Sequence, residues 1–296
     1  MPLPITRYAG GKGAVIETYP HLFPSAASIA ARGGVFREVF AGAAAVSLHR
    51  YAGRCSIALS DWNGWMVRLH RVVRDNPHAL AAVLTRMSTR YDKETYLQVR
   101  AMLNAGTLGP VDEAVAVLVI LRWGYNGLFR VNRMGKINTP FGKPSKAGTI
   151  PRLFDPANLF AVSAALQGVP LERLDFERSA ARAMRRDVVY LDPPYEPISP
   201  TASFTAYAPD WRVARAVDPA GPLHVDPGSD LARIVRTCLD LDARGVQWML
   251  SNSDTPITRR AFARRHVHRI MVPRSISSAT TKRAAVPEIF VTNYPV

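Results

Sequence analysis

Short apolar runs alternate with longer stretches of helical periodicity along most of the chain. Short segments that are typical of strands occupy residues 36–40, 56–59, 171–174, 188–191 and 246–250, and 188–191 is apolar throughout. Apolar residues at the three- and four-residue spacing of amphipathic helices occupy residues 66–74, 77–90, 93–104, 111–123 and 230–243. The last segments, 267–272 and 288–294, are typical of a closing hairpin. Strands that alternate with helices predict an α/β fold with a mostly parallel sheet.

The region between about residues 65 and 165 interrupts this alternation. It contains four helical patterns in succession and then a polar, turn-rich stretch, in which residues 130–137 resemble a hairpin with Gly135 at its turn. We therefore predict that residues 65–165 form a second domain, inserted into a domain made of residues 1–64 and 166–296. Residues 212–228, rich in Pro, Asp and Ala, are expected to form a surface loop.

The sequence Asp192-Pro193-Pro194-Tyr195 follows the apolar run 188–191 directly. Because proline has no N–H to donate, the two prolines end the predicted strand and hold Asp192 and Tyr195 at its carboxyl end. Open α/β sheets bind their ligands at that edge. A carboxylate, a main-chain carbonyl and an aromatic face suit a flat substrate with an amino group, such as a base lifted out of a nucleic-acid helix. The alternative is a plain strand–turn, since Asp-Pro and Pro-Pro are common turn signals.

Two small-residue turns are candidates for a nucleotide-type site. The N-terminal stretch 8–13 is a glycine-rich loop with Lys12, which lacks the spacing of a Walker loop and is otherwise an ordinary flexible start. The turn at 40–44 follows a predicted strand and leads into a helix, and Asp61 ends the next strand. We expect Asp61 to accept hydrogen bonds from ribose hydroxyls. Alternatively, Asp61 is the N-cap of the helix that begins near Asn63.

Aromatic, amide and cationic side chains are interleaved in residues 123–130 and 138–143. This mixture suits base stacking, wedge insertion and hydrogen bonds to base edges, although a hairpin that packs its aromatics inward would have the same pattern. Residues 251–254 are interpreted as a simple turn, with a positional role near the site as the alternative. Arg274 and Ser275 open a basic segment suited to phosphate contacts, or merely a solvated charge run.

Composition adds a candidate partner. The chain has 296 residues, a net charge of +15, 48% hydrophobic and 21% charged residues, which is typical of a globular protein that binds a polyanion. Nucleic acid is the first candidate and a membrane surface is disfavoured, because no basic amphipathic helix with an anchor is visible. Cys55 and Cys238 are interpreted as core residues, and no metal-ligand spacing occurs. Without a signal-type segment, we expect a cytoplasmic protein.

Several stretches, taken together and in order, resemble the Dam-type DNA adenine-N6 methyltransferases of bacteria and phages. They are RYAGGK, REVFAGAA, SDWN, WGYNGLFRVNRMGKINTPFG, DPPYEPISPTASFTAY, LSNSDTPIT and RSIS. The resemblance runs from Arg7 to about Tyr294 and has the arrangement of the alpha group of amino-methyltransferases. It implies a Rossmann-like S-adenosylmethionine (AdoMet)-dependent methyltransferase sheet with an inserted helical plus hairpin DNA-recognition domain. It also implies AdoMet as methyl donor and adenine in double-stranded DNA, most often in GATC, as substrate.

The resemblance assigns roles to single residues of this chain. The catalytic residues would be Asp192, Pro193, Pro194 and Tyr195. The cofactor-binding residues would be Tyr8, Gly10, Gly11, Lys12, Phe40, Gly42, Asp61, Phe176 and Asp192. The DNA-binding residues would be Arg7, Tyr125, Asn126, Leu128, Arg130 and Pro140, with Arg274 and Ser275 from the basic segment. Among these, Tyr125 and Asn126 would fill the hole left by the flipped adenine. The chain departs from the family at Ala44, where a second glycine is frequent.

Other functions share the DPPY-type motif. They are amino-methylation of another DNA sequence, of RNA or of cytosine N4, and a non-catalytic DNA-binding regulator on the same scaffold. We expect a monomer, with a dimer on DNA as the alternative.

Overall fold

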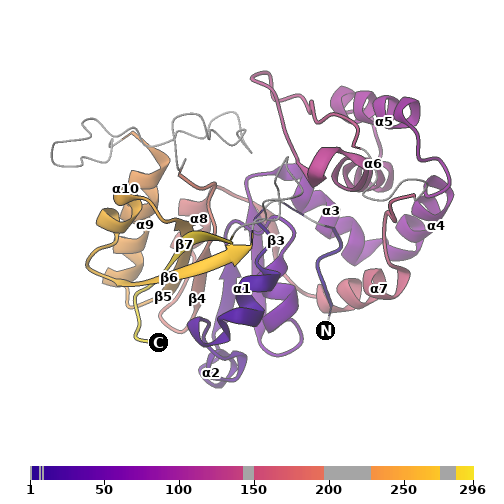
Figure 1. The fold of residues 1–296 in the computed structure, drawn as a ribbon. Helices are drawn as coiled ribbons and strands as arrows, with labels where there is room; N and C mark the ends of the chain where they lie inside the picture. Colours follow the sequence, from indigo (N-terminus) through magenta and orange to yellow (C-terminus); the bar gives the residue numbers. More distant parts are fainter. Residues whose placement is uncertain (1, 7, 9, 143–149, 197–227, 274–284) are drawn as a thin grey trace.

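Strands from both halves of the chain form one sheet. The computed structural model describes the chain except residues 1, 7, 9, 143–149, 197–227 and 274–284. Within the described residues, seven strands lie in the order β3-β2-β1-β4-β5-β7-β6 (Figure 1). Their bounds are β1 (Val35–Glu38), β2 (Ser56–Asp61), β3 (Leu171–Arg173), β4 (Val188–Leu191), β5 (Gln247–Ser253), β6 (His266–Pro273) and β7 (Ala285–Thr292). β7 runs antiparallel to both of its neighbours, and the remaining pairs are parallel.

The connections of the sheet reverse direction between β1 and β4. After β1 the chain continues to β2 on one side, whereas after β4 it continues to β5 on the other, and Phe36 pairs with Val188 between them. Such a switch point leaves a crevice at the carboxyl ends of the two strands, where α/β proteins bind ligands. The sheet therefore places the segments that follow β1 and β4 side by side.

Helices cover both faces of the central strands and bury an apolar cluster on each face. Side chains alternate along a strand, so Val188 and Tyr190 of β4 enter one apolar cluster, while Val189 and Leu191 enter a second. The second cluster is closed by α8 (Phe176–Ala181), α9 (Asp230–Ala243) and α10 (Pro256–Ala261). The first is shared with α1 (Gly13–Thr18), α2 (Ala26–Ala31), the short η1 (Pro20–Leu22) and η2 (Ser47–Tyr51), and with the helices after β2.

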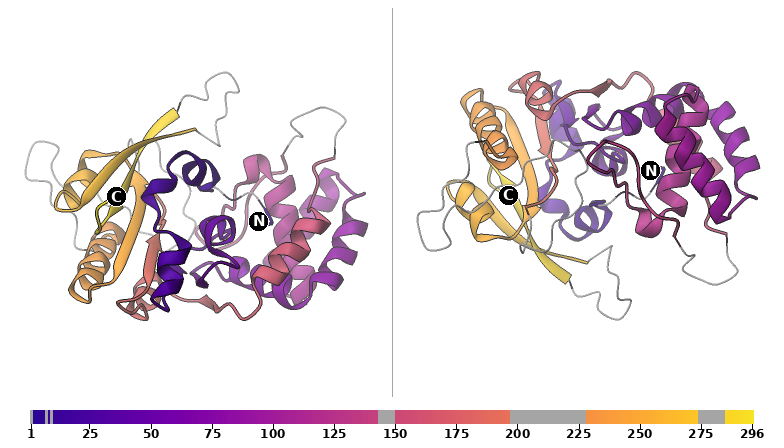
Figure 2. Two further views of the ribbon diagram at one scale, coloured as in Figure 1. Left: turned by 90° about the horizontal axis from the view of Figure 1, so that it is seen from below. Right: turned by 90° about the horizontal axis from the view of Figure 1, so that it is seen from above.

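A block of helices between β2 and β3 lies at one end of the molecule, opposite β5, β6 and β7 (Figure 2). It consists of α3 (Gly64–Asp75), α4 (Pro77–Met87), α5 (Lys93–Ala105), α6 (Pro110–Trp123), η3 (Tyr125–Gly127) and α7 (Pro156–Ala165). The residues of α6 from 114 to 121 are all buried, as expected for a helix that is apolar all round. α6 accordingly packs against α3, α4 and α5.

The predicted α/β fold with a mostly parallel sheet is confirmed, although several segment bounds differ from the prediction. β1 ends at Glu38, two residues earlier than predicted, because the chain turns there into the small-residue segment. The predicted hairpin at 130–137 is a turn with a single isolated bridge between Val131 and Ile137, and Gly135 has a φ of 71°. The division into residues 65–165 and the rest stays a prediction. In the described part of the chain, no helix is long and apolar enough to span a bilayer.

Candidate functional site

Four acidic or small-residue segments meet at the carboxyl edge of the parallel strands. The turn 40–44 follows β1, Asp61 ends β2, Asp175 lies just beyond β3, and Asp192 follows β4. Because these strands are parallel neighbours, their last residues lie at one edge. The sequence predicted three of these four segments, and Asp175 is an addition from the structure.

Asp192 forms a buried ion pair with Lys12 from the N-terminal loop. Lys12 Nζ lies 2.7 Å from Asp192 Oδ2 and donates to the carbonyl of Gly10 at 2.6 Å. The same ammonium lies 5.1 Å from the centre of the Tyr195 ring. The other oxygen, Asp192 Oδ1, is buried and accepts no hydrogen bond from any described residue. A buried carboxylate oxygen without a donor is energetically costly and is therefore a candidate acceptor for a ligand N–H.

Negative charge is concentrated around this ion pair. Burial raises the pKa of Asp192 to about 6, Lys12 opposes that rise, and the charge of Glu288 adds to it. Glu38, at the end of β1, accepts from the Ser47 N–H at 2.9 Å, and burial raises the pKa of Glu38 to about 7. Tyr195 donates its hydroxyl to Glu288 at 2.8 Å. The site thus combines several carboxyl groups with one buried ammonium, which favours a cationic ligand.

The turn after β1 is held against the end of β2 by Asp61. Asp61 accepts from the Gly42 N–H and from the Asn63 N–H, each at 2.7 Å. The N-cap of α3 is Asn63, whose side chain accepts from the Trp65 N–H, so the alternative role of Asp61 as N-cap is wrong. Each Asp61 oxygen keeps a lone pair for a further donor.

Two residues of this turn have a left-handed backbone. Gly42 has a φ of 47°, and a Cβ there would come within 3.0 Å of the Tyr8 ring, so Tyr8 and Gly42 are in close contact. Ala44 has a φ of 55°, a conformation that costs a residue with a Cβ roughly 1–2 kcal/mol. This explains physically why a glycine suits the position of Ala44. His70, which sequence reasoning missed, donates from Nε2 to the Gly42 carbonyl at 2.8 Å and fixes the turn from the side of α3.

A pocket of about 380 Å³ opens beside this turn, between the ends of β2 and β3. It is lined by Trp62, Arg173, Leu174, Asp175, Glu177, Arg178 and Arg233. Phe176 stacks on Phe40 next to it, with ring centres 5.1 Å apart and planes 27° from parallel. Trp62 is 47% exposed. Trp62 follows Asp61 in the sequence and Asp175 precedes Phe176, so their place beside two predicted site residues could have indicated them. Nothing near Arg233 in the sequence indicated a site.

The segments 124–130 and 138–142 form one unit at the edge of the helical block. The Tyr125 N–H donates to the Pro140 carbonyl at 2.8 Å. The Arg130 guanidinium donates to the Asn138 side chain at 2.8 Å and to its carbonyl at 3.0 Å. Asn126 has a φ of 53°.

The aromatic side chains of this unit are divided between core and surface. Trp123 and Phe129 are buried, whereas Tyr125 remains 41% exposed. Leu128 is half-buried and Pro140 is exposed. The half-buried Phe141 packs on Tyr91 and Tyr96. Inward packing is therefore right for Trp123, Phe129 and Phe141, and Tyr125 is available to a partner.

Residues 251–253 belong to β5 and pair with β7, so the simple turn predicted for residues 251–254 is wrong. The end of β5 supports the segment after Tyr195. Asn252 accepts from the Glu196 N–H at 3.2 Å, and Ser253 donates to the Glu196 carbonyl at 2.7 Å. Pro193 is buried and Pro194 half-buried between Asp192 and this anchor. These contacts at the end of β5 support the positional role that was the alternative interpretation. Cys238 is buried and Cys55 half-buried, in agreement with core positions. The proposed DNA contacts Arg7, Arg274 and Ser275 lie outside the described residues.

Comparisons with known proteins agree with this architecture. A family model described as D12 class N6 adenine-specific DNA methyltransferase matches residues 8–276. The chain is 31% identical over 291 residues to the DNA adenine methylase of Escherichia coli strain K12. That alignment covers 98% of this chain and 94% of the methylase. It is 28% identical over 296 residues to a type II methyltransferase of Lactococcus lactis subsp. cremoris, and that alignment covers 98% of this chain and 95% of the relative. The DNA adenine methylase of Vibrio cholerae is 28% identical to this chain over 285 residues, and that alignment covers 96% of this chain and 93% of the methylase.

Proposed function

Since the chain belongs to the D12 class of N6 adenine-specific DNA methyltransferases, we infer that it methylates a flipped adenine in duplex DNA with AdoMet as donor, within GATC. The observation that carries this proposal is the buried Asp192 Oδ1, which lacks a donor and lies at the carboxyl end of β4 beside Tyr195. An acceptor in that position is what the amino group of an extruded base requires.

The described residues fit AdoMet in three respects. The carboxyl groups around Asp192 suit a cationic sulfonium, the Asp61 lone pairs suit ribose hydroxyls, and the pocket beside Phe176 has room for a purine. AdoMet supplies an electrophilic methyl group when it is bound. Tyr8 and Gly42 would border it near the turn after β1, and Gly10, Gly11 and Lys12 would line the same end of the crevice.

The protein's chemical task is to make the adenine N6 more nucleophilic. Its lone pair is delocalised into the ring, so N6 is a poor nucleophile. We propose that its two N–H groups donate to the Asp192 carboxylate and the Pro193 carbonyl, which favours a more pyramidal nitrogen whose lone pair is directed at the methyl group. Tyr195 stacks on the base and, with Pro194, fixes the direction of approach. Positioning and electrostatics then supply most of the rate, and the proton leaves from the alkylated nitrogen, which is an acidic ammonium until it loses that proton.

Tyr125 and Asn126 are proposed to enter the DNA stack where the adenine leaves it. The exposed Tyr125 ring and the left-handed Asn126 project from a unit that is itself held by hydrogen bonds. Extrusion costs a few kcal/mol, which phosphate contacts made by a chain of net charge +15 can offset. The GATC target rests on four positions that agree in type with base-reading residues of the family: Arg7, Leu128, Arg130 and Pro140.

The experiment is methylation of mixed-sequence DNA by the purified protein and by Asp192→Ala. We expect N6-methyladenine in GATC from the wild type and no product from the variant, because the variant lacks the acceptor for the amine, while DNA binding persists. Asp240→Asn, an exposed carboxylate change on α9, is the matched control and should leave the rate unchanged.

Each other outcome contradicts a different part of the proposal. Methylation by Asp192→Ala at nearly the wild-type rate would remove the assigned chemistry. N4-methylcytosine or methylated RNA would change the substrate, and methyladenine outside GATC would change the target alone. DNA binding without any methyl transfer by the wild type would support the non-catalytic regulator.

A further inference from the structure

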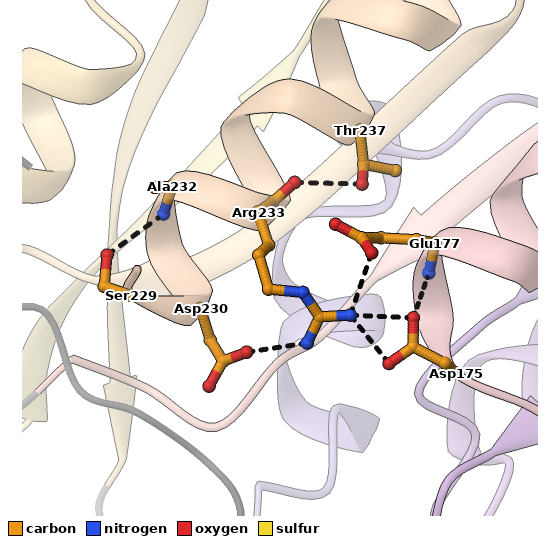
Figure 3. A network of polar contacts seen from close by, with 7 residues as sticks. All are labelled: Asp175, Glu177, Ser229, Asp230, Ala232, Arg233 and Thr237. Carbon is orange, nitrogen blue, oxygen red and sulfur yellow. Dashed lines mark hydrogen bonds and ion pairs between the residues drawn. The ribbon is translucent and has the colours of Figure 1, made fainter. Parts of the chain in front are cut away.

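Arg233 joins α9 to the segment that follows β3 through a group of ion pairs (Figure 3). Its Nη2 lies 2.8 Å from Asp175 Oδ2, 2.9 Å from Asp175 Oδ1 and 2.9 Å from Glu177 Oε2. Its Nη1 lies 2.8 Å from Asp230 Oδ1. One guanidinium therefore holds three carboxylates that would otherwise repel one another.

The same guanidinium also covers the ring of Phe176, which lies in the chain between two residues of the pocket lining, Asp175 and Glu177. Its centre lies 4.6 Å from the centre of the Phe176 ring, and that ring also stacks on Phe40. An arginine over a ring face is attracted by the ring quadrupole. Arg233, Phe176 and Phe40 thus form a continuous stack that ends at the turn after β1.

The ion-pair part of this arrangement borders the pocket, because Arg233, Asp175 and Glu177 line it. The Arg233 guanidinium contacts both oxygens of Asp175 and so fixes the direction in which that carboxylate faces. A carboxylate only accepts hydrogen bonds, so a ligand atom that faces Asp175 must be a donor. A 6-amino purine presents N–H groups at that position, whereas a 6-keto purine presents an oxygen.

We propose that Arg233 is a positioning residue for the purine end of the cofactor. It fixes the orientation of the Asp175 carboxylate and holds Phe176 in its stack, so that the pocket selects adenine over a 6-keto purine. This inference rests on the proposed use of AdoMet and goes beyond it, since it assigns base selectivity to a side chain of α9.

The test uses two ligands that differ only in the base, S-adenosylhomocysteine and S-inosylhomocysteine, bound to the full chain by titration calorimetry. For the wild type we expect the adenine ligand to bind at least about tenfold more tightly. In Arg233→Met its affinity should fall about tenfold, and the preference for adenine over hypoxanthine should approach one. Arg233→Lys keeps a positive charge but loses the planar, multidentate guanidinium. Its affinity for the adenine ligand and its preference for adenine should therefore lie between those of the wild type and Arg233→Met.

Arg236→Met is the matched control, because Arg236 is exposed on the same helix and outside the pocket lining. It should leave both affinities unchanged. In Arg233→Met, kcat at saturating AdoMet and the Kd for DNA should stay within about twofold of wild type, as befits a residue that acts on cofactor binding.

An unchanged base preference in Arg233→Met would overturn the proposal. So would an equal loss for both ligands together with a lower unfolding temperature, since that pattern marks a merely structural ion pair. If Arg233→Met does not fold, the base preference of Arg233→Lys decides in the same way. A wild-type protein that binds neither ligand and transfers no methyl group would instead contradict the proposed function.

Discussion

Replacing Lys12 with methionine should move the pH dependence of methyl transfer toward alkaline pH. Lys12 Nζ is 2.7 Å from Asp192 Oδ2, and methionine keeps the length of the stem without the charge. The ionised carboxylate is the stronger acceptor for the amine, so the rate should rise as pH passes through the pKa of Asp192. Any change in that pKa therefore appears directly in the midpoint of the rate profile.

The size of the shift follows from the ion pair. Burial raises the pKa of Asp192 to about 6 even though Lys12 opposes it. An opposite charge within hydrogen-bond distance lowers a carboxyl pKa by about 1–3 units. Without Lys12, the midpoint should lie at about pH 7 to 9, so the rate at neutral pH falls between about twofold and a hundredfold and recovers at alkaline pH.

The assay is single-turnover methylation of a short duplex at saturating cofactor and DNA, from about pH 5 to pH 9.5. Saturation matters because Lys12 also lines the proposed cofactor crevice, and a weaker affinity alone would lower the rate at every pH. Circular dichroism at each pH shows whether the variant remains folded.

Glu288→Gln provides the opposite perturbation at the same site. Glu288 raises the pKa of Asp192 by its charge, and a glutamine oxygen still accepts from the Tyr195 hydroxyl. The midpoint of the pH–rate profile of Glu288→Gln should therefore lie at lower pH than that of the wild type. If Lys12→Met leaves the midpoint in place or moves it toward acid, or if both variants move it in the same direction, Asp192 does not set the profile.

Two further changes test the cofactor and DNA assignments. Asp61→Asn should weaken AdoMet binding about tenfold in calorimetry, since an amide nitrogen then faces one of the main-chain N–H donors of Gly42 and Asn63. Unchanged AdoMet affinity would contradict the ribose role. Arg130→Ala should relax discrimination at one base pair by roughly 1–3 kcal/mol in a methylation competition between duplexes. An equal loss on all sequences would instead mark Arg130, whose fork is partly used by Asn138, as a phosphate contact.

The sequence alone predicted the position of those candidate site residues that the neighbouring residues of the chain place at a strand end. A buried run followed by two prolines fixes the position of Asp192 at a strand end, and parallel strands bring Asp61 to the same edge. These features were predictable because strand period and turn chemistry are encoded in neighbouring residues.

Contacts between distant segments were not predictable in this way. Lys12 was expected at a cofactor, but its ion pair with Asp192 depends on how the N-terminal loop crosses the sheet edge. Arg233 reaches Asp175 only because α9 packs beside α8. His70 has the sequence context of a core residue, and its bond to the Gly42 carbonyl follows from the placement of α3. Tertiary geometry, and not composition, assembles these groups.

One apolar cluster runs without interruption from the sheet into the helices between β2 and β3, with Phe36 and Leu59 at one end and Leu80 and Val117 at the other. A chimaera made by exchanging residues 65–165 with a related enzyme would therefore cut through close-packed side chains instead of a linker. Laboratory changes of target sequence should graft only the exposed loop around Tyr125 and leave α3 and α6 with their native neighbours. In this protein, new sequence preference is more accessible through point substitutions than through exchange of whole segments.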